Sequence, residues 1–182
     1  MEDEPIMQEV QAGDVARLEI LFDRHHKGLL RYFLSLTGNR PLSEDLAQEV
    51  FFRVLKYRHT YQPGAAFRAW IYSVGRNVWV DYLGRQKPEV AMPEQAGELR
   101  GKEAPPDRVL EKKQEADLLR RALASLPDDK REVLVLSRYQ ELKYEEIAAM
   151  LHCEVGTVKV RVYRALRELS DRFFALCGER AS

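Results

Sequence analysis

The chain has 182 residues, 45% hydrophobic and 32% charged, which suits one ordinary domain or two small ones and excludes an intrinsically disordered protein. Its 29 basic and 29 acidic side chains cancel, and its two cysteines form neither a disulfide framework nor a Cys-x-x-Cys zinc site. It has no apolar run near the roughly 20 residues of a membrane span and no signal peptide, so we expect a reduced cytoplasmic protein.

The first predicted helix lies in the N-terminal third. Apolar and ring-bearing side chains recur at steps of three or four from Leu18 to Leu36, which is the spacing of one helix face. The run Gly38-Asn39-Arg40-Pro41 predicts its end. His25 and His26 are not accompanied by further ligand types at metal-binding spacing, so no metal site is expected.

A second helix is predicted from about residue 43 to residue 58, with Leu46 and Val50 facing inward. The opposite face carries Asp45, Gln48, Glu49 and Phe52. An exposed phenylalanine among acidic and polar side chains is typical of an anchor for a partner helix. The alternative is that another helix of the same domain buries the ring.

A third helix is predicted over residues 67–83, with Phe67, Ile71, Val74 and Val78 inward. Segment 61–88 carries four basic side chains and one acidic one, a net charge of +3. Aromatic rings interleaved with arginines favour single-stranded DNA, because rings stack on unpaired bases and an Asn can read a base edge. The alternative is that the rings fill the core of a small domain. The candidate contacts are Arg68, Trp70, Tyr72, Arg76, Asn77 and Trp79.

Seven prolines and glycines punctuate residues 84–106, and this polar stretch is too long for a loop inside one compact domain. We therefore predict a flexible linker over residues 88–107, between a domain at residues 10–87 and another at 108–177. Because no period-two alternation predicts a strand, the fold class is all-α. With little sequence after residue 174, no further C-terminal domain is expected.

The C-terminal domain is predicted to contain a helix-turn-helix, with helices at 144–151 and 156–174. Segment 156–172 has five basic and two acidic residues, a net charge of +3. A basic helix of this kind can enter a major groove, where Arg reads guanine. The alternative is the solvated face of a plain helical hairpin. The face opposite the apolar stripe, with its flanks, carries Thr157, Lys159, Val160, Tyr163, Arg164 and Arg167.

Three ordered motifs carry a family resemblance across residues 10–176. They are Asp45-Leu-Ala-Gln-Glu-Val-Phe, then Phe67-Arg-Ala-Trp-Ile-Tyr-Ser-Val-Gly-Arg-Asn77, then Tyr144-Glu-Glu-Ile-Ala with Gly156-Thr-Val-Lys-Val-Arg. Together they closely resemble the extracytoplasmic-function (ECF) sigma factors. The resemblance implies a factor that brings core RNA polymerase to a promoter and helps to open it.

The resemblance also implies partners. The face with Phe52 matches the helix that binds the polymerase clamp, and contacts with both the clamp and flap regions of core RNA polymerase are expected. Residues 62–81 match the segment that recognises and melts the −10 element, with Asn77 lining a pocket for a flipped base. Lys159, Val160, Tyr163 and Arg164 match the −35-reading helix, where Val160 replaces the usual Ser. Many family members are held by an anti-sigma factor, often membrane-anchored.

We find no nucleophile motif or phosphate-binding loop, so no enzyme activity, cofactor or small-molecule substrate is expected. One alternative is a helix-turn-helix regulator that acts without polymerase, which leaves the Trp-rich basic helix unexplained. Another is an adaptor that binds only proteins, which leaves the basic face around Lys159 and Arg164 unexplained.

Overall fold

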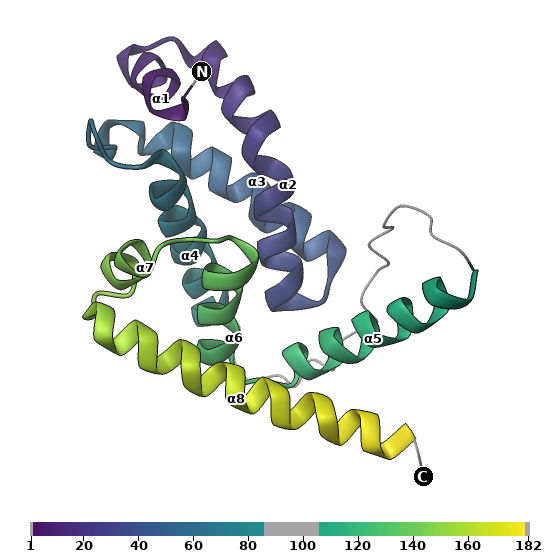
Figure 1. The fold of residues 1–182 in the computed structure, drawn as a ribbon. Helices are drawn as coiled ribbons and strands as arrows, with labels where there is room; N and C mark the ends of the chain where they lie inside the picture. The colour runs from purple at the N-terminus through teal and green to yellow at the C-terminus, as the bar shows by residue number, and fades with distance from the viewer. Residues whose placement is uncertain (1, 86–105, 181–182) are drawn as a thin grey trace. The chain divides into compact units, whose positions relative to one another are not determined.

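The computed structural model describes residues 2–85 and 106–180 (Figure 1). The chain divides into two units, Met1–Gln95 and Ala96–Ser182. Every regular element in the described ranges is helical, which confirms the all-α prediction. The predicted linker lies outside the described residues except at positions 106 and 107, which begin a helix.

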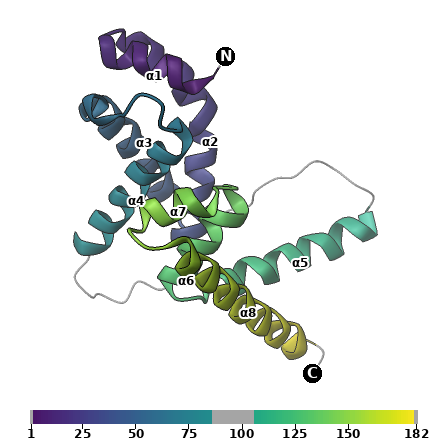
Figure 2. The same ribbon diagram turned by 60° about the vertical axis from the view of Figure 1, so that its left-hand side comes forward.

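Three long helices form the core of the N-terminal unit, and a short one packs on them (Figures 1 and 2). Among the largest side chains that are fully buried in this core are Leu29, Phe33, Phe67 and Ile71. Burial of each such apolar side chain contributes about 1.5–3 kcal/mol. The elements are α1 (Asp3–Ala12), the 3-10 turn η1 (Val15–Arg17), α2 (Leu18–Thr37), α3 (Arg40–Lys56), the 3-10 turn η2 (Arg58–Thr60) and α4 (Phe67–Arg85).

The sequence analysis did not anticipate helix α1. Its Ile6, Met7 and Val10 are fully buried although the surrounding residues are mostly acidic or polar. Three apolar residues in a ten-residue helix are too few to reveal a periodicity, and α1 depends on packing against the rest of the unit. The N-terminal unit therefore contains an element that begins before residue 10, the predicted domain start.

Helix α3 begins at Arg40, three residues before the predicted start at residue 43. The side-chain oxygen of Asn39 accepts a hydrogen bond from Leu42 N at 3.0 Å, so Asn39 caps the helix. Pro41 lies in the first turn, where its missing N–H costs nothing. The Pro that indicated the end of the preceding helix therefore belongs to the start of this one.

The C-terminal unit places α8 against α5, α6 and α7. Leu123, Leu134, Val158 and Val162 are among its buried apolar side chains. Leu119 is 37% exposed, whereas the adjacent Leu118 is buried. The elements are α5 (Pro106–Ala124), α6 (Asp128–Leu134), the π-helical turn η3 (Val135–Tyr139), α7 (Tyr144–Met150) and α8 (Val155–Arg180).

Candidate protein-binding and nucleic-acid-binding surfaces

The outer face of α3 forms the first candidate surface, and we call Asp45, Gln48, Glu49 and Phe52 the α3 face. Phe52 is 61% exposed, so the alternative that a helix of its own unit buries it is wrong. The neighbouring Phe51 is the core residue, with its ring 4.8 Å from that of Phe22. The ring of Phe52 is therefore accessible to a partner, whereas that of Phe51 is not.

Arg53 fixes one edge of the α3 face. Its Nε donates to Glu49 Oε1 at 2.7 Å and its Nη1 donates to Asp81 Oδ2 at 2.6 Å. Partial burial lowers the pKa of Arg53, but the hydrogen bonds to Glu49 and Asp81 outweigh it and raise the pKa overall. The bridge joins α3 to α4, so it holds the Glu49 carboxylate in place beside the exposed ring.

Two aromatic residues predicted to face DNA are buried in the core. Tyr72 is 3% exposed and Trp79 is 6% exposed, so their predicted outward orientation is wrong. Tyr72 meets Tyr32 edge-on at 5.7 Å, and burial raises the pKa of Tyr72 to about 12. Trp79 stacks on Tyr82 at 5.6 Å. Helix α4 packs against both α2 and α3, so its buried arc is wider than one stripe.

The other four predicted residues of α4 remain accessible. Arg68 and Asn77 are exposed, whereas Trp70 and Arg76 are half-buried. Trp70 belongs to an aromatic cluster, with its ring 5.3 Å from Tyr61 and 6.0 Å from Phe67. Trp70 and Asn77 are seven residues apart and therefore lie on one side of the helix. We call the accessible set Arg68, Trp70, Arg76 and Asn77 the α4 face, in which Arg68 lies on the opposite side of the helix from Trp70 and Asn77.

The predicted helix-turn-helix consists of α7, a four-residue turn and α8. Glu146 Oε2 accepts from the backbone N–H of Lys143 at 2.7 Å, which supplies half of a capping box without a Ser or Thr at position 143. In the turn, His152 has φ of +50°, and Cys153 N donates to Ala148 O at 3.0 Å. This bond closes the turn so that α8 leaves at a defined angle.

The outward side of α8 carries the predicted basic face. Val160 is 47% exposed and Tyr163 is 66% exposed, while Val158, Val162 and Ala165 are buried as predicted. Within the predicted set, Thr157, Lys159, Arg164 and Arg167 are exposed too. We call Thr157, Lys159, Val160, Tyr163, Arg164 and Arg167 the α8 face.

Glu168 is the acidic residue nearest the α8 face in the sequence. It binds Lys130 of α6, and its Oε1 accepts from Arg172 Nη2 at 2.6 Å. These hydrogen bonds lower the pKa of the Glu168 carboxyl. Glu168 therefore links α6 to α8, and the two basic side chains that it pairs with, Lys130 and Arg172, are not part of the α8 face.

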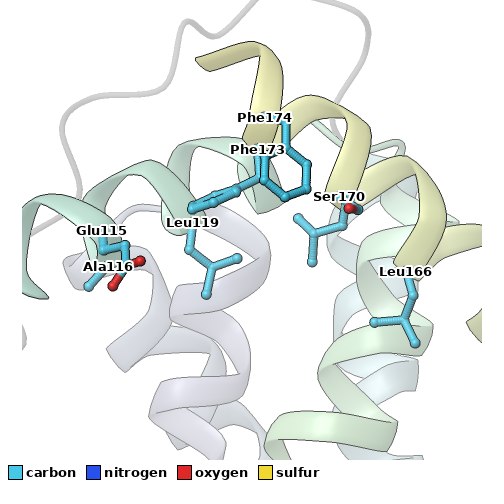
Figure 3. Close-up of a pocket in the computed structure, with 8 residues that line it drawn as sticks. Glu115, Ala116, Leu119, Leu166, Ser170, Phe173 and Phe174 are labelled. Atoms are coloured by element: carbon cyan, nitrogen blue, oxygen red, sulfur yellow. The ribbon is translucent and has the colours of Figure 1, made fainter. Parts of the chain in front are cut away.

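An apolar groove lies between α5 and α8, with a volume of about 600 Å³ (Figure 3). Leu119 lines one side, and Leu166, Phe173 and Phe174 line the other. Phe174 is 68% exposed. The sequence pattern did not predict this groove, and the adjacent pair Phe173-Phe174 is the signal that could have indicated it.

Among the residues the structure describes, no three His, Cys, Asp or Glu side chains gather as a metal site would require. His25 instead contacts Asp3 Oδ2 through Nε2 at 2.7 Å. In the same described ranges, no helix has the length and apolar character to cross a bilayer.

Both surfaces of the N-terminal unit fall within a match to the family model described as sigma-70 region 2, which covers residues 21–89. The model described as sigma-70, region 4 matches residues 116–169 and includes the helix-turn-helix. The two matches occur in the order that the three sequence motifs predict.

Curated relatives extend the match. The ECF RNA polymerase sigma-E factor of Escherichia coli is 30% identical over 93% of both chains. The ECF sigma factor EcfG of Rhodopseudomonas palustris is 35% identical, over 78% of this chain and 77% of that protein. The ECF sigma factor SigE of Mycolicibacterium smegmatis is 33% identical over 87% of this chain, which spans 63% of that protein.

Solved structures show the same fold. CnrH, in complex with the cytosolic domain of CnrY, aligns with a TM-score of 0.71 and 22% identity over 95% of this chain and 97% of that chain. The sigma factor RpoE, in complex with the anti-sigma factor NepR from Bartonella quintana, aligns with a TM-score of 0.63 and 24% identity over 85% and 94%.

Proposed function

Because this chain belongs to the ECF RNA polymerase sigma factors, we propose that its two helical units divide promoter recognition between an opened −10 element and a duplex −35 element. The chemistry of RNA synthesis resides in the polymerase, and this chain is an initiation factor. One observation carries the proposal: the α3, α4 and α8 faces present accessible groups suited to a protein, to unpaired bases and to a duplex, respectively.

The α3 face is proposed to bind core RNA polymerase at the coiled coil of the clamp. Phe52 supplies an apolar anchor, and Asp45, Gln48 and Glu49 surround it with polar and acidic groups. The Arg53 bridge holds Glu49 before any partner arrives, which reduces the side-chain entropy lost on binding.

The α4 face is proposed to hold the opened −10 strand. Asn77 can hydrogen-bond a base edge, Trp70 offers a ring for stacking, and Arg68 offers a charge for phosphate. Tyr72 and Trp79 are assigned to the core instead, because their rings are not accessible to a base.

The α8 face is proposed to enter the major groove of the −35 element. Arg164 is placed to read guanine, and Lys159 and Arg167 are placed to bind phosphates on either side. Val160 can make only apolar contacts, so we expect it to meet a thymine methyl rather than a hydrogen-bonding edge.

Arg164→Ala is expected to reduce discrimination at one −35 base pair by about 1–3 kcal/mol, because a bidentate contact to guanine is lost. The measurement is the affinity of the polymerase holoenzyme for promoters that carry each substitution in the −35 element. The control is Arg121→Ala, which removes an exposed arginine from α5. Unchanged discrimination in Arg164→Ala, or equal losses in both variants, would contradict the assignment.

Run-off transcription with core polymerase tests the function itself. The full chain should direct specific initiation that core polymerase alone does not achieve. Duplex binding without a requirement for polymerase would instead indicate a free-standing regulator, and an absence of DNA binding in either setting would indicate a protein adaptor.

Control of this chain is proposed to come from an anti-sigma factor. The solved structures of CnrH and RpoE are complexes with CnrY and the anti-sigma factor NepR. The α3 and α8 faces are accessible without an activating step, so a covering protein is the direct way to silence them. We place the chain in the cytoplasm, on the nucleoid when active and at the membrane if its inhibitor is anchored there.

Tagged protein purified from unstressed cells should bring down an inhibitor protein, and added core polymerase should displace that inhibitor.

A further inference from the structure

The segment between α3 and α4, residues 57–66, directly precedes the α4 face, and we call it the α3–α4 loop. Tyr61 lies at its centre, 1% exposed, and its hydroxyl donates to Ala65 O across the loop. The same ring is 5.3 Å from Trp70 of the α4 face. The position of Trp70 therefore depends on the conformation of this loop.

Helix α1 holds the loop from outside through one side chain. Gln11 Nε2 donates to His59 O at 3.3 Å and to Tyr61 O at 3.0 Å. Both acceptors are backbone carbonyls, so the bonds constrain the path of the chain whatever side chains the loop carries. Without Gln11 the two carbonyls lose this partner, and the loop gains conformational freedom.

Helix α1 also caps the start of α4. Glu4 Oε1 accepts a hydrogen bond from Phe67 N at 3.1 Å. The first N–H groups of a helix have no partner within the helix, and a carboxylate there is favoured by the helix dipole. Glu4 and Gln11 therefore act on the two sides of the short stretch that leads from the loop into α4.

Helix α1 is itself fixed to the rest of the N-terminal unit by apolar packing and by polar contacts. Ile6, Met7 and Val10 are buried against the unit. Arg24 Nη1 donates to Asp3 Oδ1 at 2.7 Å, and the His25 ring, which contacts Asp3, meets Phe67 edge-on at 5.2 Å. Movement of α1 would therefore shift the first residue of α4 along with the loop.

We propose that α1 is a positioning element for promoter opening, in which Gln11 and Glu4 hold the α3–α4 loop and the start of α4 so that Trp70 and Asn77 meet the opened strand in one geometry. The inference rests on the proposed assignment of the α4 face to the −10 element. Helix α1 ends at Ala12 and lies before residue 21, where the region 2 match begins, so the brace is a feature of this chain outside the matched segment.

Gln11→Ala tests the brace, with Gln8→Ala as a matched control that removes an exposed glutamine from the same helix. Gln11→Ala should reduce the rate of promoter opening, read from permanganate reactivity of promoter thymines, by about fivefold. This is the scale of one lost hydrogen bond, because the longer of the two bonds, to His59 O, is exposed to solvent and contributes little. The ratio of opening rates between a promoter with the native −10 element and promoters with one substituted −10 base should also become smaller in this variant. Affinity for core polymerase, measured in the same preparations, should stay within about twofold of the wild type, because surface changes distant from a contact have little effect on it.

A second pair of variants separates the hydrogen bond from general destabilisation. Glu4→Gln keeps an acceptor oxygen for Phe67 N and should retain most of the opening rate, whereas Glu4→Ala should lose it. Equal opening by Gln11→Ala and Gln8→Ala would overturn the inference. So would a parallel loss of core affinity and opening, or equal losses in both Glu4 variants. If the wild-type protein opens no promoter with core polymerase, the proposed function fails as well, whereas normal wild-type opening confines any failure to the brace.

Discussion

Trp79→Ala is expected to lower the free energy of unfolding of the N-terminal unit by about 3–5 kcal/mol, the cost of deleting a large buried ring. The side chain is 6% exposed and stacks on Tyr82. Because small domains have only about 5–15 kcal/mol of stability, this change should remove much of the unit's folded population near its working temperature.

Denaturant unfolding followed by tryptophan fluorescence measures this effect in the full chain. Both tryptophans, Trp70 and Trp79, lie in the N-terminal unit, so Trp70 remains in the variant as a reporter of that unit alone. Trp79→Phe is the control and should retain most of the stability, since it keeps a ring in the core. A loss below about 1 kcal/mol combined with failed promoter opening would instead place Trp79 at the DNA.

Phe52→Ala is expected to weaken binding of core polymerase by about 2 kcal/mol or more, roughly a thirtyfold loss of affinity. The ring is 61% exposed, so its removal should change the stability of the free protein by no more than about 0.5 kcal/mol. Fluorescence anisotropy of labelled protein titrated with core polymerase gives the affinity.

The adjacent Phe51 provides the matched control. It is 6% exposed, so Phe51→Ala should cost about 3–5 kcal/mol of stability through a cavity in the core. Phe52→Ala should therefore lower the affinity for core polymerase without unfolding the protein, whereas Phe51→Ala should lower the free energy of unfolding. Unaltered core affinity in a well-folded Phe52→Ala variant would exclude the α3 face as the main polymerase contact.

The faces of α3 and α8 could be predicted from the sequence because apolar residues fall on one side of each helix and polar or charged residues on the other. On α8, buried Val158, Val162 and Ala165 alternate with exposed basic and aromatic residues at helical spacing. On α3, the same spacing left Phe52 among polar neighbours. Where the buried side of a helix is a single apolar stripe, the 3.6-residue period of the apolar residues predicts which side chains are exposed to solvent.

Helix α4 did not follow that rule, because three helices, α1, α2 and α3, pack against it. Periodicity gives the angle between side chains around a helix, but it does not give the width of the arc that neighbours cover. Tyr72 and Trp79 therefore appeared to lie on an outer face, although α2 and α3 enclose that part of α4. Only the packing separated Trp70, which stays partly accessible, from Trp79, which does not.

The sequence by itself determined the all-α class, the helix-turn-helix, the two basic segments and the place of Phe52 on the polar side of its helix, because these depend on spacing between residues close in the chain. The tertiary structure decided which aromatic rings are available to a partner, and it showed the hydrogen bonds from α1 to the α3–α4 loop and to the start of α4. The hydrogen bonds of Glu4 and Gln11 join residues 48 to 63 positions apart. Glu4 accepts from a backbone N–H and Gln11 donates to backbone carbonyls, so the partner residues leave no side-chain pattern in the sequence. Such contacts form only when separate helices are brought together, so no local periodicity records them.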